Sequence, residues 1–133
     1  SMSPNDNEAF AVKGSLELNQ LSGLISDASY EIGQTPQVQE GGRRVIDSIS
    51  SLLINFELSD AQRFLNQIAR TSVAFGNVTT LFIIEEGTID ETILNNIKYI
   101  MDGVIELKAE NQDRFLRVAS MKWAPFKAGW VQI

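Results

Sequence analysis

The segment "RRVIDSIS" (residues 43–50) decides the fold because it reads as a buried strand that ends in a carboxylate. Residues 45–46 are β-branched and apolar, which favours a strand, and Asp47 follows where that strand would end. An aspartate in this place either holds a magnesium ion, as in nucleotide-hydrolysing folds, or only caps the turn. The nearby Ser48 and Ser50 are expected to form local hydrogen bonds within that turn.

A second strand is predicted by "VTTLFIIEE" (residues 78–86), which has no polar residue between Thr80 and Glu85. An apolar, β-branched run of this kind is typical of a strand that is buried on both faces in a parallel sheet. Ligands bind at the carboxyl ends of such strands, where Asp47 and the Glu85–Glu86 pair are expected to lie. The two glutamates are either paired carboxylates for acid–base chemistry or a solvated strand end that caps the next helix.

Helical segments alternate with the predicted strands. Residues 15–32 carry one apolar stripe with spacings of three and four, with Ser15 as the expected N-cap. Two further helices are predicted at residues 59–76, with Ser59 at a capping-box spacing from Gln62, and at residues 90–101. The remaining predicted strands are a short one at residues 10–13, a hairpin at 102–110 and 114–122, and a last strand at 129–133.

This alternation of strands and helices predicts an α/β fold. We expect three layers, with a mostly parallel sheet flanked by helices and an antiparallel C-terminal hairpin. Residues 1–9 are polar and are expected to be loosely ordered, with residues 1–2 as a remnant of cloning. Residues 10–133 are expected to form one domain.

Composition excludes several kinds of chemistry. The 133 residues include no histidine and no cysteine, which excludes imidazole bases, thiol nucleophiles and zinc–thiolate sites. The net charge of −6 argues against a nucleic-acid-binding surface. The apolar runs are too short to cross a bilayer, and the cysteine-free composition favours a cytoplasmic protein.

Four segments in a fixed order resemble one known family. "RRVIDSIS", "TTLFIIEEG", "IKYIMDGVIEL" and "RFLRVASMK" are similar to the carboxyl-terminal half of the KaiC-like domain, a RecA-superfamily ATPase common in archaea. The resemblance implies a RecA-like sheet and assigns three groups of residues. These are Asp47 and Ser48 in a Walker B strand, Thr79, Thr80 and Glu85 in a sensor strand, and Ser120 and Lys122 at the finger that reaches a neighbouring subunit's nucleotide.

The sequence departs from this family where ATP would be bound. Phosphate binding needs a G-x-x-x-x-G-K-[ST] loop, and the chain contains no Gly-Lys dipeptide. The family's finger has a lysine and an arginine two residues apart, whereas this chain has Ser120 and Lys122. A lysine lacks the bidentate fork of an arginine.

The missing phosphate-binding loop and the altered finger determine the function that we expect. We expect a non-catalytic KaiC-like domain that acts through protein–protein contact in a regulatory or scaffold role, without ATPase activity of its own. The alternative is the Walker B half of a genuine ATPase, with ATP and Mg²⁺ bound only if a P-loop is supplied from outside this chain. A third reading is an unrelated enzyme that uses Asp47, Glu85 and Glu86. No metal or other cofactor is expected.

The tail "KWAPFKAGW" (residues 122–130) clusters Trp123, Phe126 and Trp130. These aromatic residues suit a protein interface, packing of the C-terminal hairpin, or stacking on single-stranded nucleic acid, which the acidic charge balance disfavours. We expect a homo-oligomer or a related RecA-fold partner, with neither nucleic acid nor membrane. We also expect the strand at 78–84 to pair directly with that at 103–107, and a homodimer to bury part of the tail.

Overall fold

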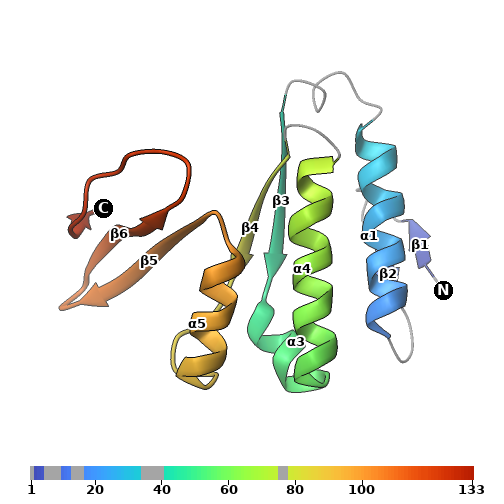
Figure 1. Ribbon diagram of the computed structural model, residues 1–133, viewed down its shortest axis with the longest axis horizontal. Coiled ribbons are helices and arrows are strands. Elements are labelled where there is room, and N and C mark those ends of the chain that lie inside the picture. Colours follow the sequence, from blue (N-terminus) through green and yellow to red (C-terminus); the bar gives the residue numbers. More distant parts are fainter. Residues whose placement is uncertain (1, 5–9, 13–16, 34–40, 75–77) are drawn as a thin grey trace. The chain divides into compact units, whose positions relative to one another are not determined.

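The computed structural model describes residues 2–4, 10–12, 17–33, 41–74 and 78–133 (Figure 1). The chain divides into two compact units, Ser1–Glu85 and Glu86–Ile133, which we describe separately. The first unit contains a parallel pair of strands with helices, and the second contains an antiparallel sheet. The predicted α/β fold class with an antiparallel C-terminal hairpin is therefore confirmed.

The first unit begins with a short hairpin and a helix. Strands β1 (Met2–Pro4) and β2 (Phe10–Val12) pair antiparallel, and the sequence predicts only the second of them. Helix α1 (Leu18–Gly33) follows. The backbone carbonyl of Glu17 accepts from the Leu21 N–H at 3.0 Å, and the Glu17 N–H donates to the side chain of Gln20 at 3.3 Å. Glu17 therefore precedes the first turn, and the predicted cap Ser15 lies outside the described residues.

Two parallel strands form the sheet of the first unit. Strand β3 (Gly42–Asp47) pairs with β4 (Val78–Ile83) in a register that runs from Gly42 opposite Val78 to Asp47 opposite Ile83. The carboxyl ends of the two strands therefore coincide, as the sequence predicts.

Helices α3 (Ile49–Asn55) and α4 (Leu58–Ala74) connect these strands. Helix α4 carries the predicted apolar stripe, because Phe64, Leu65 and Ile68 are at most 3% exposed. The helix contacts α1 and β4, and Figure 1 shows α1 and α4 side by side. The predicted cap Ser59 lies inside the first turn of α4, which begins one residue earlier.

Within the described part of the first unit, helices cover one face of the β3–β4 sheet. Phe82 is half-buried, whereas Val45, Leu81 and Ile83 are 55%, 52% and 43% exposed and alternate with the half-buried residues. The predicted burial of residues 78–86 on both faces is wrong. In the described part of this unit the helices cover one face, so side chains with strand periodicity are buried on that side alone.

The second unit consists of a helix and an antiparallel sheet. Helix α5 spans Glu91–Ile100, and its N-cap Asp90 accepts from the Thr92 N–H at 2.8 Å. The hairpin turn is formed by Asn111 and Gln112, both at positive φ (49° and 72°), as a two-residue turn that follows strand twist requires. The sheet has the order β5–β6–β7, with bounds Gly103–Glu110, Asp113–Met121 and Val131–Gln132.

The expected direct pairing of the 78–84 strand with the 103–107 strand would join the two units and stays a prediction. Within the first unit β4 pairs with β3, and within the second unit β5 pairs with β6 through the tight turn. Strands that are neighbours in sequence pair at the lowest cost in loop entropy, which favours the hairpin. None of the described helices combines the length and apolar character needed to cross a membrane.

Candidate functional site

The carboxyl ends of β3 and β4 bring two of the predicted site residues to one edge. Asp47 ends β3 opposite Ile83, and Glu85 lies two residues beyond Ile83. Both carboxylate side chains are exposed. In the described part of the chain, no hydrogen bond or ion pair engages the side chain of Asp47.

Two serines form hydrogen bonds at this edge of the sheet. Ser48 is the N-cap of α3, because its Oγ accepts from the Ser51 N–H at 3.4 Å, so the capping residue is Ser48 and not Asp47. Ser50 is only 5% exposed, and its Oγ accepts from the backbone N–H of Glu85 at 3.1 Å. That bond spans 35 residues and ties α3 to the end of β4, whereas the sequence suggested only a local role.

The sensor-strand threonines lie elsewhere on β4. Thr79 and Thr80 stand opposite Arg43 and Arg44, in the first half of the strand. Three residues, or about 10 Å of strand, separate Thr80 from Ile83 at the edge. The structure therefore does not bring these threonines together with Asp47.

Arg44 has a structural role that the sequence reasoning missed. Its Nε donates to Thr80 Oγ1 at 3.2 Å, and its Nη2 donates to the backbone carbonyl of Ile68 in α4 at 3.1 Å. Burial lowers the pKa of the Arg44 guanidinium from its ordinary value. The sequence does contain a signal of this structural role. An arginine lies inside a predicted strand, on the same face as apolar residues.

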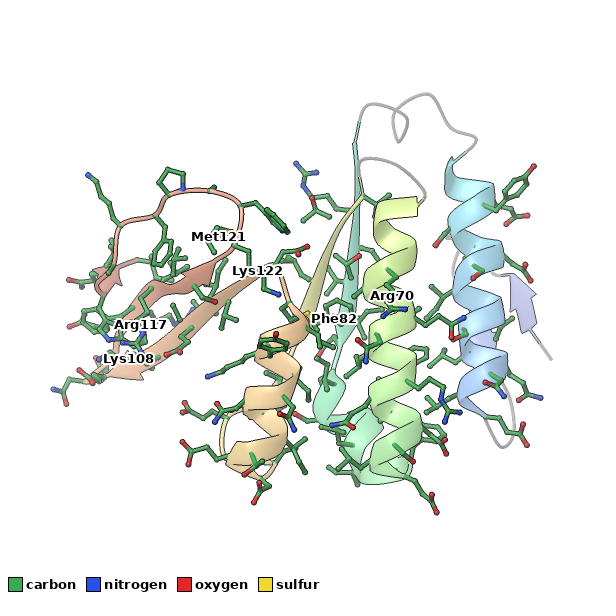
Figure 2. The ribbon with its side chains drawn as sticks, viewed as in Figure 1. Arg70, Phe82, Lys108, Arg117, Met121 and Lys122 are labelled. Atoms are coloured by element: carbon green, nitrogen blue, oxygen red, sulfur yellow. The ribbon has the colours of Figure 1, made fainter. Side chains whose placement is uncertain are left out.

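The residues of the expected finger are placed at the end of β6. Ser120 is exposed in β6. Lys122 donates from Nζ to the Tyr99 carbonyl at 2.7 Å, and its N–H donates to the Asp102 carbonyl at 2.8 Å. A cation at the carboxyl end of α5 complements the helix dipole. Figure 2 labels Lys122, whose ammonium is thus engaged within its own unit.

Trp130 packs against the cations of the sheet. Its ring lies 4.3 Å from Lys108 Nζ and 4.7 Å from Arg117 Cζ, distances at which cations are attracted to the ring face. Arg117 also donates to one oxygen of Glu106, from Nη2 at 2.8 Å and from Nε at 3.1 Å. Figure 2 labels Lys108 and Arg117, which lie close together on β5 and β6.

The other two aromatic residues of the tail are more exposed. Trp123 is 82% exposed, although its Nε1 donates to Asp102 Oδ1 at 3.2 Å, and Phe126 is 43% exposed. The three aromatic residues therefore divide into a packed Trp130 and an outward pair, which the sequence alone does not distinguish.

Asp47 is exposed at the end of β3, the position considered for Mg²⁺ from the sequence. Among the described residues, no group of three or more acidic side chains is placed to hold a metal ion.

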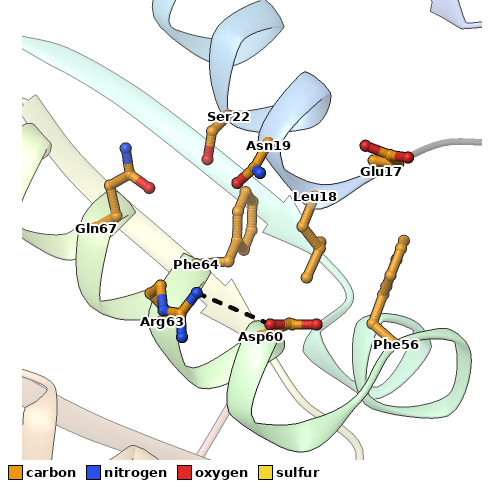
Figure 3. A pocket seen from close by; sticks show the side chains of 9 residues that line it. All are labelled: Glu17, Leu18, Asn19, Ser22, Phe56, Asp60, Arg63, Phe64 and Gln67. Carbon is orange, nitrogen blue, oxygen red and sulfur yellow. Dashed lines mark ion pairs between the residues drawn. The ribbon is translucent and has the colours of Figure 1, made fainter.

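A separate cavity of about 260 Å³ lies between α1, α4 and the end of α3 (Figure 3). An ion pair of 4.0 Å between Arg63 and Asp60 borders the cavity. Both side chains are more than half exposed, so the ion pair contributes little to stability. The other lining residues are Glu17, Leu18, Asn19, Ser22, Phe56, Phe64 and Gln67. None of the site residues predicted from the sequence lines this cavity.

Comparison with known proteins identifies the fold. No family model and no curated protein sequence matches the chain. Among solved structures, the crystal structure of a KaiC-like protein from the hyperthermophilic archaeon Pyrococcus horikoshii OT3 matches with a TM-score of 0.63 at 19% identity. The match covers 88% of this chain and 52% of that one, so this chain spans about half the length of its structural relative. The chain therefore shares the α/β fold of that KaiC-like protein over the matched part.

Proposed function

We propose that this chain is a KaiC-like domain without ATPase activity of its own, which binds another protein in a regulatory or scaffold role in the cytoplasm. The observation that carries the proposal is the outer face of the β3–β4 sheet. Val45 and Leu81 are cross-strand neighbours, Ile83 is next along β4, and all three are 43–55% exposed. Contiguous exposed apolar side chains of this kind mark sites of protein contact.

The open edges of the same sheet support this reading. Strands β3 and β4 form a two-stranded sheet, so in the described part of the chain each strand has one unpaired edge. Two strands alone are marginally stable, and open edges are available for pairing with another chain. Arg43 and Asp47 lie at opposite ends of the outer face and are exposed. A complementary partner, such as a related RecA-fold protein, would present an acid near Arg43 and a base near Asp47.

The absence of ATPase activity is tested by calorimetric titration of the whole chain with Mg-ATP. We expect no measurable binding, because the sequence has no phosphate-binding loop. A micromolar dissociation constant, equivalent to about −8 kcal/mol, would show that the chain binds nucleotide by itself and would contradict the proposal.

The docking face is tested with a pair of matched variants. Leu81→Asp places a charge on the outer face of the sheet, whereas Ile54→Asp places one at an apolar residue of α3 that is 74% exposed. We expect a protein that co-purifies with the tagged wild-type chain in a fixed ratio to remain with Ile54→Asp and to be lost with Leu81→Asp. Equal retention by both variants would exclude this face as the contact.

A second candidate is the Walker B half of a divided ATPase. It is favoured by the exposed Asp47 at the carboxyl end of β3 and by the match to 52% of a KaiC-like protein. The test is to mix the chain with a P-loop-bearing half-domain and to measure ATP hydrolysis. This candidate requires activity that appears on mixing, disappears with Asp47→Asn and survives in the control Glu86→Gln. Activity that is indifferent to Asp47 would rule it out.

A further inference from the structure

The cavity between α1, α4 and the end of α3 belongs wholly to the first unit. All of its lining residues fall between Glu17 and Gln67, so its form is set within that unit. On α4 the lining positions have the spacing of one helix face, and they are Asp60, Arg63, Phe64 and Gln67. Helix α4 contacts α1, which supplies the opposite wall. Two packed helices therefore shape the cavity.

The floor of the cavity is apolar. Leu18 of α1 is 8% exposed and Phe64 of α4 is 3% exposed. Figure 3 shows both side chains in the middle of the lining residues. Phe56, which follows α3, is half-buried and adds a second aromatic ring to the lining. An apolar floor below polar side chains is the usual composition of a small-molecule site.

The two ends of the cavity differ in chemistry. Figure 3 shows Glu17 and Phe56 toward one end, with Asp60 on the same side as Phe56. Ser22 and Gln67 lie toward the other end. Asp60 and Gln67 are seven residues apart on one helix, or about 10 Å. One end therefore offers carboxylates and an aromatic ring, and the other offers a hydroxyl and an amide.

The polar side chains of the lining have few partners within the described residues. The side chains of Asn19, Ser22 and Gln67 form no hydrogen bond with another described residue. Arg63 and Asp60 are 4.0 Å apart, which is longer than a hydrogen bond. A guanidinium has five N–H donors, so most of the binding capacity of Arg63 is available to a ligand.

We propose that this cavity binds a free aliphatic α-amino acid. The ammonium group binds Asp60 and Glu17 and lies beside the ring of Phe56, because carboxylates and ring faces both attract cations. The carboxylate binds the guanidinium of Arg63 and the amide of Gln67. The aliphatic side chain contacts the apolar floor. The two charges of an α-amino acid are separated by one carbon atom, which suits a guanidinium and a carboxylate as close together as those of Arg63 and Asp60.

Charge and size select this class of ligand over others. The lining has two carboxylates, Glu17 and Asp60, and one guanidinium, Arg63, so it repels a simple anion and leaves a simple cation facing Arg63. A wholly apolar ligand would take these polar groups out of water without replacing their hydrogen bonds. The volume of about 260 Å³ lies below the range of about 300–1,000 Å³ that is typical of drug-sized ligands. A ligand of amino-acid size is therefore favoured over a nucleotide.

Nuclear magnetic resonance titration of the whole isotope-labelled chain with L-leucine tests the site. We expect the backbone resonances of Ser22 and Gln67 to shift, with a dissociation constant of about 1 mM or lower. Isoamylamine has the same branched group and no carboxylate, whereas isocaproate has that group and no ammonium. Each of these two compounds should bind at least about tenfold more weakly than L-leucine.

Matched variants locate the two charged contacts. Arg63→Gln and Asp60→Asn should each weaken L-leucine binding at least about tenfold. Arg70→Gln changes an exposed arginine of α4 that does not line the cavity and is labelled in Figure 2, so binding should be unchanged. Arg63 and Asp60 are more than half exposed, so their variants should keep the fold, and circular dichroism checks this.

Three results would overturn the proposal. These are no shift of α1 or α4 resonances at about 10 mM L-leucine, which corresponds to a tenfold weaker site, equal binding of either single-charge compound, and binding that tolerates both Arg63→Gln and Asp60→Asn. The cavity lies among helices and the proposed docking face lies on the β3–β4 sheet. Leu81→Asp should therefore leave L-leucine binding unchanged, and either proposal can fail without the other.

Discussion

The two units of this chain use their apolar residues in different ways. Among the described residues, the buried hydrophobic side chains of the first unit are Leu18, Ile49, Ala61, Phe64, Leu65 and Ile68, whereas the second unit has Ile97 alone. The second unit is not short of apolar residues, since Ile105, Leu107, Val131 and Ile133 are all more than half exposed.

This difference shows that hydrophobicity and burial are separate properties. The first unit places a helix stripe against a sheet and removes both from water, which is the dominant favourable term in folding. The second unit is joined by its hairpin ladder and by the polar contacts among Glu106, Arg117, Lys108 and Trp130. We therefore expect core substitutions in the first unit to have larger effects on stability than substitutions in the second.

The largest effect is expected for Leu65→Ala. Leu65 is fully buried in the stripe of α4, and a truncation there should lower the free energy of unfolding by about 2–5 kcal/mol. Urea unfolding followed by circular dichroism measures the change, with Ile54→Ala as the exposed control. Similar losses in the two variants would mean that α4 does not form the core of its unit.

The next effect concerns the half-buried Arg44. Arg44→Ala removes the hydrogen bonds to Thr80 Oγ1 and to the Ile68 carbonyl, and hydrogen bonds from charged groups contribute about 1.5–3 kcal/mol. Arg43→Ala alters the neighbouring exposed residue and should change the free energy of unfolding by no more than about 0.5 kcal/mol. If the two alanine variants were equally stable in urea, the anchoring role of Arg44 would be disproved.

A smaller effect is expected for the packed tryptophan of the second unit. Trp130→Ala removes the ring between Lys108 and Arg117. This substitution should lower the free energy of unfolding by about 1–2 kcal/mol. Trp123→Ala removes a side chain that is 82% exposed, so it should lower the free energy of unfolding by less than Trp130→Ala does. Each variant keeps one tryptophan, so fluorescence follows its unfolding in urea. The reverse order would place Trp123, and not Trp130, in the packed cluster.

The smallest effect is expected for Asp47→Ala. The carboxylate is exposed, and the capping bond at this turn is made by Ser48. The free energy of unfolding should therefore change by less than about 0.5 kcal/mol. If the free energy of unfolding measured by denaturant titration fell by several kcal/mol, Asp47 would have to take part in a hydrogen-bond network. Asp47 and Arg44 would then no longer differ in their contribution to stability.

The sequence by itself determined most of the elements and their order, but neither β1 nor α3. β-branched runs at residues 45–46 and 78–83 encode strands, and apolar spacings of three and four encode α1, α4 and α5, because both patterns are local. The parallel pairing of β3 and β4 followed from the alternation of strands and helices. The segment that forms α3 is a short apolar run, and such a run fits a helix or a strand equally well.

Tertiary structure alone decided which faces are covered and which residues meet. The bond from Glu85 to Ser50 and the bond from Arg44 to Ile68 join residues 35 and 24 positions apart, beyond the reach of any periodic pattern. The same holds for Leu81, which has the character of a core residue and is 52% exposed. Whether an apolar side chain is buried depends on which distant segment packs against it, because burial is a property of the assembled surface and not of the residue.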